Sequence, residues 1–160
     1  MYLGTQEICA EYGLNSYEIS NYARQGAESR HNLIYWRYGD YAGIGPGAHA
    51  RLTLDSRRTA LHTQTNPKSW LEAVSTFGHG MLEPEILTAE DQAIEYLMMS
   101  MRLAEGSDLR RYQDLAGKGL SPIHIKRLTD LGMIETDGTI LKSSQTGRPL
   151  LNAILSELLA

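Results

Sequence analysis

Cysteine is nearly absent from this sequence, in which Cys9 is the single one among 160 residues. One cysteine cannot form an internal disulfide bond, a pair of zinc thiolates or the ligand set of an iron–sulfur cluster. Its neighbours Ile8 and Tyr12 follow a weak helical pattern, so we expect Cys9 to be a small core residue. Chemistry that needs two thiolates of this chain is therefore excluded.

Long apolar runs and an excess of positive charge are also missing. No stretch is apolar enough to cross a bilayer, and the N-terminus lacks a basic segment followed by an apolar one. A net charge of -4 argues against broad attraction to nucleic acid or acidic membranes. We expect a cytoplasmic protein, with peripheral contact with a membrane left open. The 42% of hydrophobic residues are enough for a globular core of one or two domains.

The segment from Arg30 to His49 holds the most chemistry. His31 beside bulky aromatics and arginines matches the needs of a haem site, which are a nitrogen for iron, flat faces for the macrocycle and cations for the propionates. The same residues also fit a structural alternative, in which the histidine is hydrogen-bonded to the backbone and Tyr35 and Trp36 anchor a loop to the core. In a helix His31 pairs with Tyr35, whereas in a strand the two share one face.

A glycine-rich run follows at residues 43–47. It has no GxGxxG pattern and no following Lys-Ser/Thr, and Pro46 removes an amide donor, so we do not expect a nucleotide phosphate site. We expect a buried strand over Asp40–Ile44 that ends in these glycines. Missing β-carbons there serve either the approach of a ligand or tight packing.

The remaining polar candidates are isolated. The other histidines have no spacing typical of a metal cluster, and they are His49, His62, His79 and His124. Glu18 has two interpretations. It is either a general base or substrate partner, or a buried carboxylate bonded to Asn21 or an arginine. The patterns around it predict a helix up to Tyr12 closed by Gly13, a strand over Tyr17–Ser20 and a loop over residues 21–30.

Further along, the patterns predict a hairpin, then a group of helices with a second hairpin. The first hairpin joins residues 51–54 and 58–63, and a helix starts at Asn66 and ends at Gly78. Thr88 and Asp91 begin a longer helix that runs to Gly106, with Ile94, Leu97, Met98 and Met101 in the core.

The last third predicts helix, helix, hairpin and helix, which is a winged-helix-like arrangement. One helix is capped by Ser107 or Asp108 and runs to Ala116, and Ser121-Pro122 begins another that ends at Gly132. A type I′ turn at Asp137-Gly138 joins two strands. Thr146 caps the last helix, whose inward residues are Leu151, Ile154, Leu155 and Leu158. We therefore expect two domains, residues 1–80 and 81–160. A winged helix raises the alternative of nucleic-acid binding through Lys126 and Arg127, but their helix is mostly apolar and no nucleic acid is expected.

Three motifs resemble one protein family in order and spacing. They are YEISNYAR at residues 17–24, HNLIYW at 31–36 and GIGPGAH at 43–49. Together they resemble the oxygen-independent coproporphyrinogen III oxidase-like radical SAM family, in its HemW haem-chaperone branch. Residues 103–106 and 146–148 resemble the C-terminal domain of that family, so the resemblance covers essentially the whole chain.

The departures from the family matter equally. Members carry a CxxxCxxC motif for a [4Fe–4S] cluster and S-adenosylmethionine, with the first strands of a partial TIM-type barrel, and this chain has neither. Gln25 stands where the family usually has proline. The resemblance therefore implies the C-terminal part of such a protein: an α/β fold of late barrel strands and helices, then the winged-helix-like α+β domain. Such a fragment is expected to be catalytically inert, with S-adenosylmethionine and the cluster bound in the full-length parent.

The resemblance also implies roles for particular residues. Haem contact falls on His31, Asn32, Tyr35 and Trp36, with His31 as the metal ligand. The resemblance also implies that four residues lie near the S-adenosylmethionine site, namely Gly43, Gly45, Gly47 and Ala48. The implied parent binds haem and passes it to haem-requiring membrane enzymes. The alternative is an oxidase that decarboxylates coproporphyrinogen III in porphyrin biosynthesis. A truncated barrel would also leave an unpaired strand edge and favour self-association.

Overall fold

The computed structural model describes residues 2–160, with side chains from residue 4 onward; Met1, where the first predicted helix begins, lies outside this range. The chain folds into two compact units. One contains the described residues up to Tyr38 together with Ala93–Ala160, and the other contains Gly39–Gln92. These units divide the chain differently from the domains 1–80 and 81–160, which stay a prediction.

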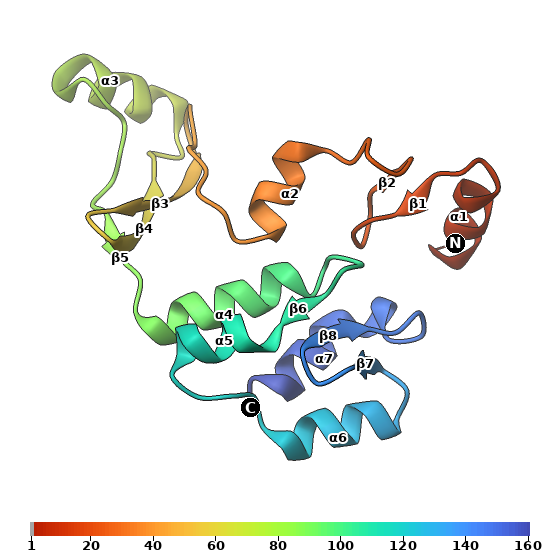
Figure 1. The fold of residues 1–160 in the computed structure, drawn as a ribbon. Helices are drawn as coiled ribbons and strands as arrows, with labels where there is room; N and C mark the ends of the chain where they lie inside the picture. The colour runs from red at the N-terminus through yellow and green to blue at the C-terminus, as the bar shows by residue number, and fades with distance from the viewer. Residues whose placement is uncertain (1) are drawn as a thin grey trace. The chain divides into compact units, whose positions relative to one another are not determined.

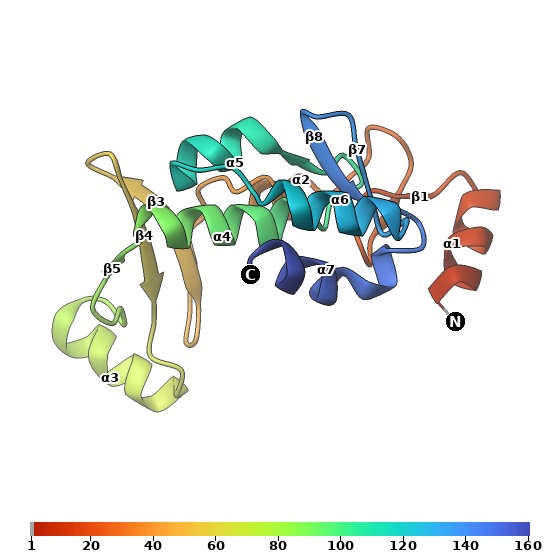
Figure 2. The same ribbon diagram turned by 90° about the horizontal axis from the view of Figure 1, so that it is seen from below.

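The C-terminal part of the first unit has the element order expected of a winged helix. Figure 1 shows its helices gathered around three short strands, and Figure 2 shows the same group from below. The strands are antiparallel and lie in the order β6-β8-β7. In chain order the elements are α4 (Ala89–Ser100), β6 (Ser107–Asp108), α5 (Leu109–Ala116), α6 (Pro122–Asp130), β7 (Ile134–Thr136), β8 (Ile140–Ser143), the 3-10 helix η1 (Arg148–Leu150) and α7 (Leu151–Leu158).

The core of this part lies between the helices and the sheet. The residues that α7 buries are the four that the sequence predicts, namely Leu151, Ile154, Leu155 and Leu158. Helix α4 buries Ala93, Tyr96, Leu97 and Ser100. Of the four residues predicted to lie in the core, Leu97 and Met101 are fully buried, so these two predictions are confirmed. Met98 is 46% exposed and Ile94 is half-buried, so these two were wrong.

The N-terminal part of the first unit docks onto the turn that follows α4. It consists of α1 (Tyr2–Glu11), β1 (Asn15–Ser16), β2 (Tyr22–Ala23) and α2 (Arg30–Trp36). Glu18 pairs with Leu103 in an isolated antiparallel bridge, and Ala104 N donates to Tyr17 O at 3.0 Å. Leu103 is 2% exposed. The YEISN motif therefore has its backbone fixed to a buried point of the winged-helix-like part.

The second unit is a three-stranded antiparallel sheet followed along the chain by the start of α4. Its elements are β3 (His49–Leu54), β4 (Arg57–His62), α3 (Pro67–Phe77) and β5 (Glu85–Ile86). The predicted hairpin is confirmed, with a two-residue turn in which Asp55 and Ser56 both have positive φ. Helix α3 is confirmed from its Asn66 N-cap to the left-handed Gly78, and Thr88 and Asp91 bond reciprocally before α4.

Several predictions from local patterns were wrong. Asp40–Ile44 is not a buried strand, because Ile44 is 93% exposed and the segment pairs only through a single bridge of Tyr41 with Arg51. Positive φ at Gly45 and Gly47 turns the chain there instead.

Further corrections concern helix ends and burial. The helix predicted to reach Gly106 ends at Ser100, whose hydroxyl donates to Tyr96 O at 2.7 Å and competes with helix continuation. The strand predicted at Tyr17–Ser20 is shorter and earlier, at β1. Cys9 is half-buried rather than in the core, on a helix that leaves Tyr12 73% exposed.

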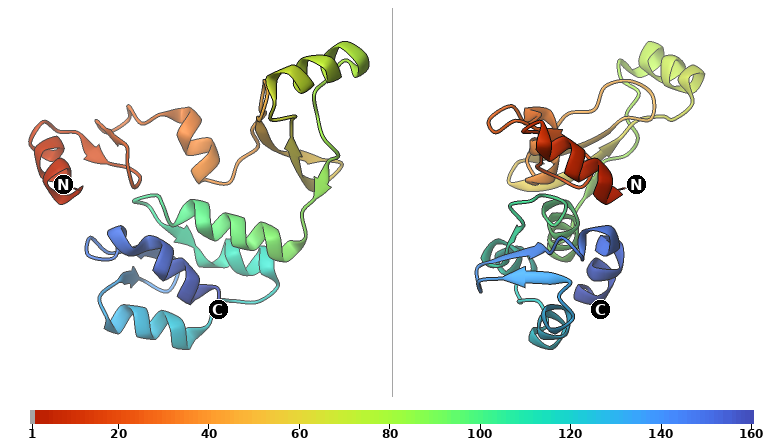
Figure 3. Two further views of the ribbon diagram at one scale, coloured as in Figure 1. Left: turned by 180° about the vertical axis from the view of Figure 1, so that it is seen from behind. Right: turned by 90° about the vertical axis from the view of Figure 1, so that its right-hand side faces the viewer.

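The start of the last helix and the wing turn also differ from prediction. Thr146 does not cap α7; the chain enters it through η1, and Ser144 Oγ accepts from Gly147 N at 2.9 Å. The wing loop has three residues, 137–139, rather than two, and within it only Gly138 has positive φ, so the turn is not type I′. Figure 3 shows the resulting β7–β8 hairpin beside α7.

The Asp137 carboxylate is the group that organises this wing turn. It accepts from Ile140 N at 2.7 Å and Thr139 N at 2.8 Å, and these bonds lower its pKa below the ordinary value of 3.8. A depressed folded-state pKa contributes stability above the unfolded pKa, and that stability is lost as pH falls through the folded pKa. We expect the melting-temperature advantage of wild type over Asp137→Asn to be constant above about pH 5 and to shrink below about pH 4. An advantage that did not change with pH would contradict this assignment.

No helix in the part of the chain that the structure describes combines the length and the apolar character needed to span a membrane.

Candidate functional site

The HNLIYW motif forms α2, so the helical alternative is the correct one. Ser29 caps the helix, its hydroxyl accepting from Asn32 N at 3.3 Å. A spacing of four residues places His31 with Tyr35, and Asn32 with Trp36, on two adjacent faces. One face therefore carries the exposed imidazole, and the other turns toward the rest of the first unit.

On the first face, the His31 ring is exposed and held by a single neighbour. Tyr35 Oη lies 2.5 Å from His31 Nε2 and 3.5 Å from Nδ1, and the rings meet edge to face with centroids 4.7 Å apart. When the Tyr35 hydroxyl accepts a hydrogen bond from Nε2–H, the tautomer carries no proton on Nδ1. The contact thus orients the exposed imidazole, and in this tautomer the lone pair of Nδ1 is available to a ligand.

On the second face, Asn32 and Trp36 contact residues far away in sequence. Asn32 Nδ2 donates to Tyr17 Oη at 3.2 Å, which joins the HNLIYW motif to the YEISN motif. The Arg102 guanidinium carbon lies 4.7 Å from the Trp36 ring centroid, in a cation–π contact. Trp36 Nε1 is buried and has no acceptor within the described part of the chain. All four motif residues therefore lie on one helix, two of them toward solvent and two toward this contact network.

The C-terminal end of α2 is fixed by two arginines. Arg37 Nε and Nη2 donate to the two carboxylate oxygens of Glu105, both at 2.8 Å, and this bidentate pairing raises the pKa of Arg37. Arg111 donates to Arg37 O at 3.0 Å, so it satisfies a carbonyl at the helix end, and it lies over the Tyr96 ring. The short helix is thereby held in orientation against the winged-helix-like part.

Glu18 is fully buried and bonded within its own motif. Its Oε1 accepts from Ser20 N at 2.7 Å, from Ser20 Oγ at 3.0 Å and from Asn21 Nδ2 at 2.6 Å. Its Oε2 accepts no hydrogen bond from the described residues. The sequence left two alternatives for Glu18, a general base or substrate partner and a buried structural carboxylate. The geometry favours the second, because the side chain has no access to solvent and one of its oxygens accepts three hydrogen bonds that hold the loop.

The GIGPGAH segment forms a turn pinned to β4 in the second unit. Thr63 Oγ1 donates to Gly45 O at 2.6 Å and accepts from Ala48 N at 2.8 Å. Gly47 N donates to Gln64 O at 2.8 Å. The backbone amides of Gly47 and Ala48 therefore already donate hydrogen bonds within the protein, so they are not available to a ligand. Thr63, which the motif pattern does not include, is the residue that organises the turn.

The glycines of this turn are required for backbone reasons. A β-carbon at Gly43 would overlap the carbonyl oxygen of His49 and lie 2.8 Å from its carbonyl carbon, whereas Gly45 has open space but a φ of +100. The sequence left tight packing and ligand approach open. Tight packing accounts for Gly43, and left-handed backbone accounts for Gly45 and Gly47.

We expect Gly43→Ala to destabilise the second unit by about 2 kcal/mol, because the new methyl group meets backbone that cannot move independently. Gly45→Ala is the matched comparison and should cost about 1 kcal/mol, from backbone strain alone. Urea unfolding of the two variants measures the difference. Equal stabilities, or a less stable Gly45→Ala, would show that the approach of His49 is not the constraint.

The candidate ligand groups fit this chain unequally. The described residues contain no group of three or more histidine, cysteine or acidic side chains that could hold a metal ion. A haem iron needs only one protein nitrogen, and the exposed His31 fits that demand. A [4Fe–4S] cluster does not fit, because Cys9 is the one cysteine of the sequence. His49 and His62 oppose each other across β3 and β4, with ring centroids 4.4 Å apart, but no third ligand joins them among the described side chains.

Comparison with known proteins agrees with the motifs. Residues 87–150 match the HemN C-terminal domain family. The chain is 33% identical over 173 residues to the mitochondrial radical S-adenosyl methionine domain-containing protein 1 of Bos taurus, covering 100% of this chain and 38% of that protein. It is 31% identical to the heme chaperone HemW of Escherichia coli, covering 96% and 40%. The chain thus spans well under half the length of these relatives.

A solved structure shares the fold. The coproporphyrinogen III oxidase HemN of Escherichia coli, a radical SAM enzyme, aligns with a TM-score of 0.68 at 16% sequence identity, over 98% of this chain and 39% of that one. The α/β fold class is therefore confirmed for essentially the whole chain.

Proposed function

Because this chain belongs to the HemN- and HemW-like radical SAM proteins, as a C-terminal part of such a protein, we propose that it supplies the haem-contact helix of a haem chaperone. His31 would ligate the iron, and the parent would pass haem to haem-requiring enzymes. The radical SAM cluster and S-adenosylmethionine would be bound by residues upstream of this chain in the parent. Gly43, Gly45, Gly47 and Ala48 would line that neighbourhood through their backbone only.

One observation carries the proposal: an exposed imidazole on a helix whose orientation is fixed elsewhere. Ser29 caps α2 at one end, and Arg37 and Arg111 fix the other. A ligand that stands on a fixed helix and remains open to solvent can accept haem and release it again. A buried histidine would need local opening for each transfer. The geometry thus suits a carried group better than a permanent one.

The residues of α2 would have different roles in haem binding. Haem would supply an iron that accepts a protein nitrogen as ligand. His31 supplies the nitrogen, and Tyr35 fixes the ring orientation and the tautomer. Trp36 and Arg102 supply a flat, positively charged boundary beside the helix. Asn32 acts indirectly, through its hydrogen bond to Tyr17.

Titration of the purified chain with haemin tests the proposal, with the Soret absorption as the signal. We expect saturable binding at one haem per chain and a shifted Soret band. Weak, unsaturable association would remove the chaperone role from this chain. The oxidase alternative is tested in the full-length parent with reduced cluster, S-adenosylmethionine and coproporphyrinogen III, because rapid protoporphyrinogen formation would replace the chaperone proposal.

Tyr35→Phe isolates the role of the hydroxyl. If Tyr35 orients the imidazole, its loss should weaken haemin binding by about tenfold, the usual effect of removing a group that orients a metal ligand. Titration beside wild type measures the ratio. Equal or tighter binding would mean that Nε2 is the ligating nitrogen, which the hydroxyl masks, and would overturn the assignment of Nδ1.

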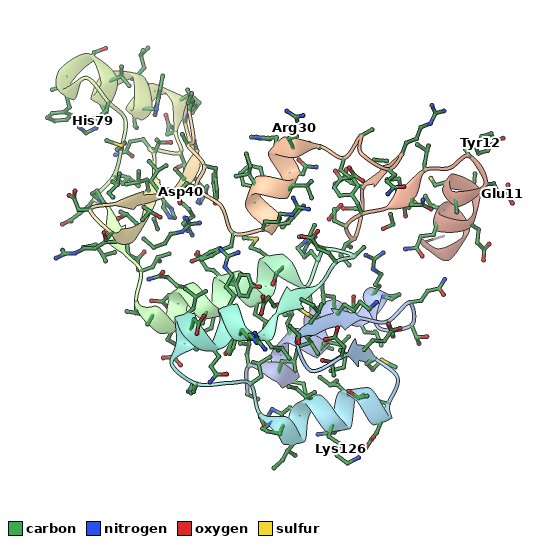
Figure 4. All side chains as sticks on the ribbon, in the orientation of Figure 1. Glu11, Tyr12, Arg30, Asp40, His79 and Lys126 are labelled. Carbon is green, nitrogen blue, oxygen red and sulfur yellow. The ribbon has the colours of Figure 1, made fainter. Side chains whose placement is uncertain are left out.

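Nucleic-acid binding remains the weaker candidate, and the charges on α6 explain why. Lys126 points outward from this helix (Figure 4), but its Nζ lies 2.8 Å from Asp130 Oδ2. Arg127 Nη1 lies 3.0 Å from Glu157 Oε1. Both basic side chains are therefore paired with carboxylates, which lowers their attraction for phosphates. Duplex binding that weakens steeply with salt would reverse this judgement.

A further inference from the structure

Three buried nitrogens of tryptophan and arginine side chains in the first unit have no acceptor among the residues that the structure describes. They are Trp36 Nε1, Arg102 Nε and Arg148 Nη2. Buried donors in folded proteins are nearly always hydrogen-bonded, and an orphaned one calls for a missing acceptor. Two of the three belong to guanidinium groups, which bind carboxylates and phosphates through pairs of nitrogens.

The two arginines line one cavity, of about 400 Å³. Its other walls are Ile19 and residues 149–153, at the start of α7. This lining contains two cations and no carboxylate, and α7 begins without a side-chain cap. The uncapped helix start adds a smaller positive potential to that of the guanidinium groups. The cavity therefore suits a small anionic group.

Each arginine contacts one side chain and has one buried nitrogen without an acceptor among the described residues. Arg148 Nη1 donates to Ser16 Oγ at 2.9 Å, which leaves Nη2 unused. Arg102 lies 4.7 Å from the centre of the Trp36 ring and also lines the cavity. The same guanidinium thus touches both the haem motif and the cavity wall. Glu18, the buried carboxylate beside Ile19 in sequence, forms no ion pair with either arginine among the described residues.

We propose that this cavity binds a propionate carboxylate of haem, with Arg102 and Arg148 as the residues that recognise it. The inference rests on the proposed haem function, and it names the chemical feature that the site selects. Haem has two propionates on one edge, and each is a carboxylate that matches a guanidinium pair in charge and geometry. The site would then prefer porphyrins with free propionates over those whose propionates are blocked.

The test compares haemin with haemin dimethyl ester, whose carboxylates are capped by methyl groups. Wild type, Arg102→Gln and Arg148→Gln are titrated with both, and Arg110→Gln, an exposed arginine of α5, is the matched control. We expect wild type and the control to bind haemin about tenfold more tightly than the ester, the ratio expected of one charged hydrogen-bond pair. Both cavity variants should lose most of this preference. Arg148→Gln should bind the ester unchanged, whereas Arg102→Gln should also bind the ester more weakly, because Arg102 covers the Trp36 ring.

The outcomes separate the inference from the function on which it rests. Wild type that binds both porphyrins equally overturns the inference but keeps haem binding, whereas wild type that binds neither overturns both. Equal losses of affinity for haemin and the ester in the variants would show that the arginines only support the fold. Thermal melts of the variants check this directly. Arg148→Lys is a second check, because it should retain part of the preference for haemin. Competition by S-adenosylmethionine that disappears in the variants would assign the cavity to an amino-acid carboxylate and overturn the propionate.

Discussion

Replacing His31 with alanine is expected to weaken haemin binding by at least about tenfold and to remove the shifted Soret band. The expectation follows from geometry, since His31 is the one imidazole on α2 and its ring faces solvent. Contacts through Trp36 and Arg102 persist in the variant, so residual binding of an unligated porphyrin is expected. The spectrum should then resemble that of haemin without a histidine ligand.

His79→Ala is the matched control, because His79 is also an exposed histidine but lies outside α2, with Nδ1 3.3 Å from Met81 N. Its titration should match that of wild type in affinity and in the position of the Soret band. If His31→Ala kept both, His31 would not be a ligand. If His79→Ala lost them, the binding would be a general property of exposed histidines.

Replacing Glu18 with alanine is expected to destabilise the first unit by about 3 kcal/mol. The substitution removes the acceptor of three hydrogen bonds from Ser20 and Asn21, and it leaves a cavity at a fully buried position. Urea unfolding measures the loss. The effect should extend to haem binding only where unfolding is appreciable, because Glu18 is not expected to touch the ligand.

Glu18→Gln is the conservative comparison. Its amide carbonyl can accept the hydrogen bonds that Oε1 receives, and its NH2 group occupies the position of the orphaned Oε2, so we expect a loss of about 1 kcal/mol. A glutamine variant as unstable as the alanine variant would mean that the charge, not the acceptor, holds the loop. A fully stable alanine variant would remove Glu18 from the account of this motif.

Local signals in the sequence predicted most helix starts. Asn66, Asp108 and Ser121 accept backbone hydrogen bonds at the positions where their caps were expected. These signals act within one helical turn, so a single sequence contains them in full. The end of α4 was harder to predict, because the local bond of Ser100 acts together with the pairing of Leu103 with Glu18, and that pairing joins residues far apart in the chain.

The candidate site was predicted only in part, for the same reason. The motif placed His31 and Tyr35 correctly as neighbours once the segment was helical. Nothing local indicates that Arg102 lies over Trp36 or that Arg148 shares a cavity with it, since these contacts span much of the chain. In the glycine turn, the close approach of His49 accounts for Gly43 without a ligand, and the proximity of Gly43 to an S-adenosylmethionine site stays a prediction.

The most direct measurement of the central claim is pulsed electron paramagnetic resonance of the haemin-loaded chain, with histidine labelled by nitrogen-15. The account predicts hyperfine coupling between the ferric iron and one histidine nitrogen in wild type, and its disappearance in His31→Ala with His79→Ala unchanged. Haemin that binds stoichiometrically without any histidine coupling, or a coupling that survives in His31→Ala, would contradict it.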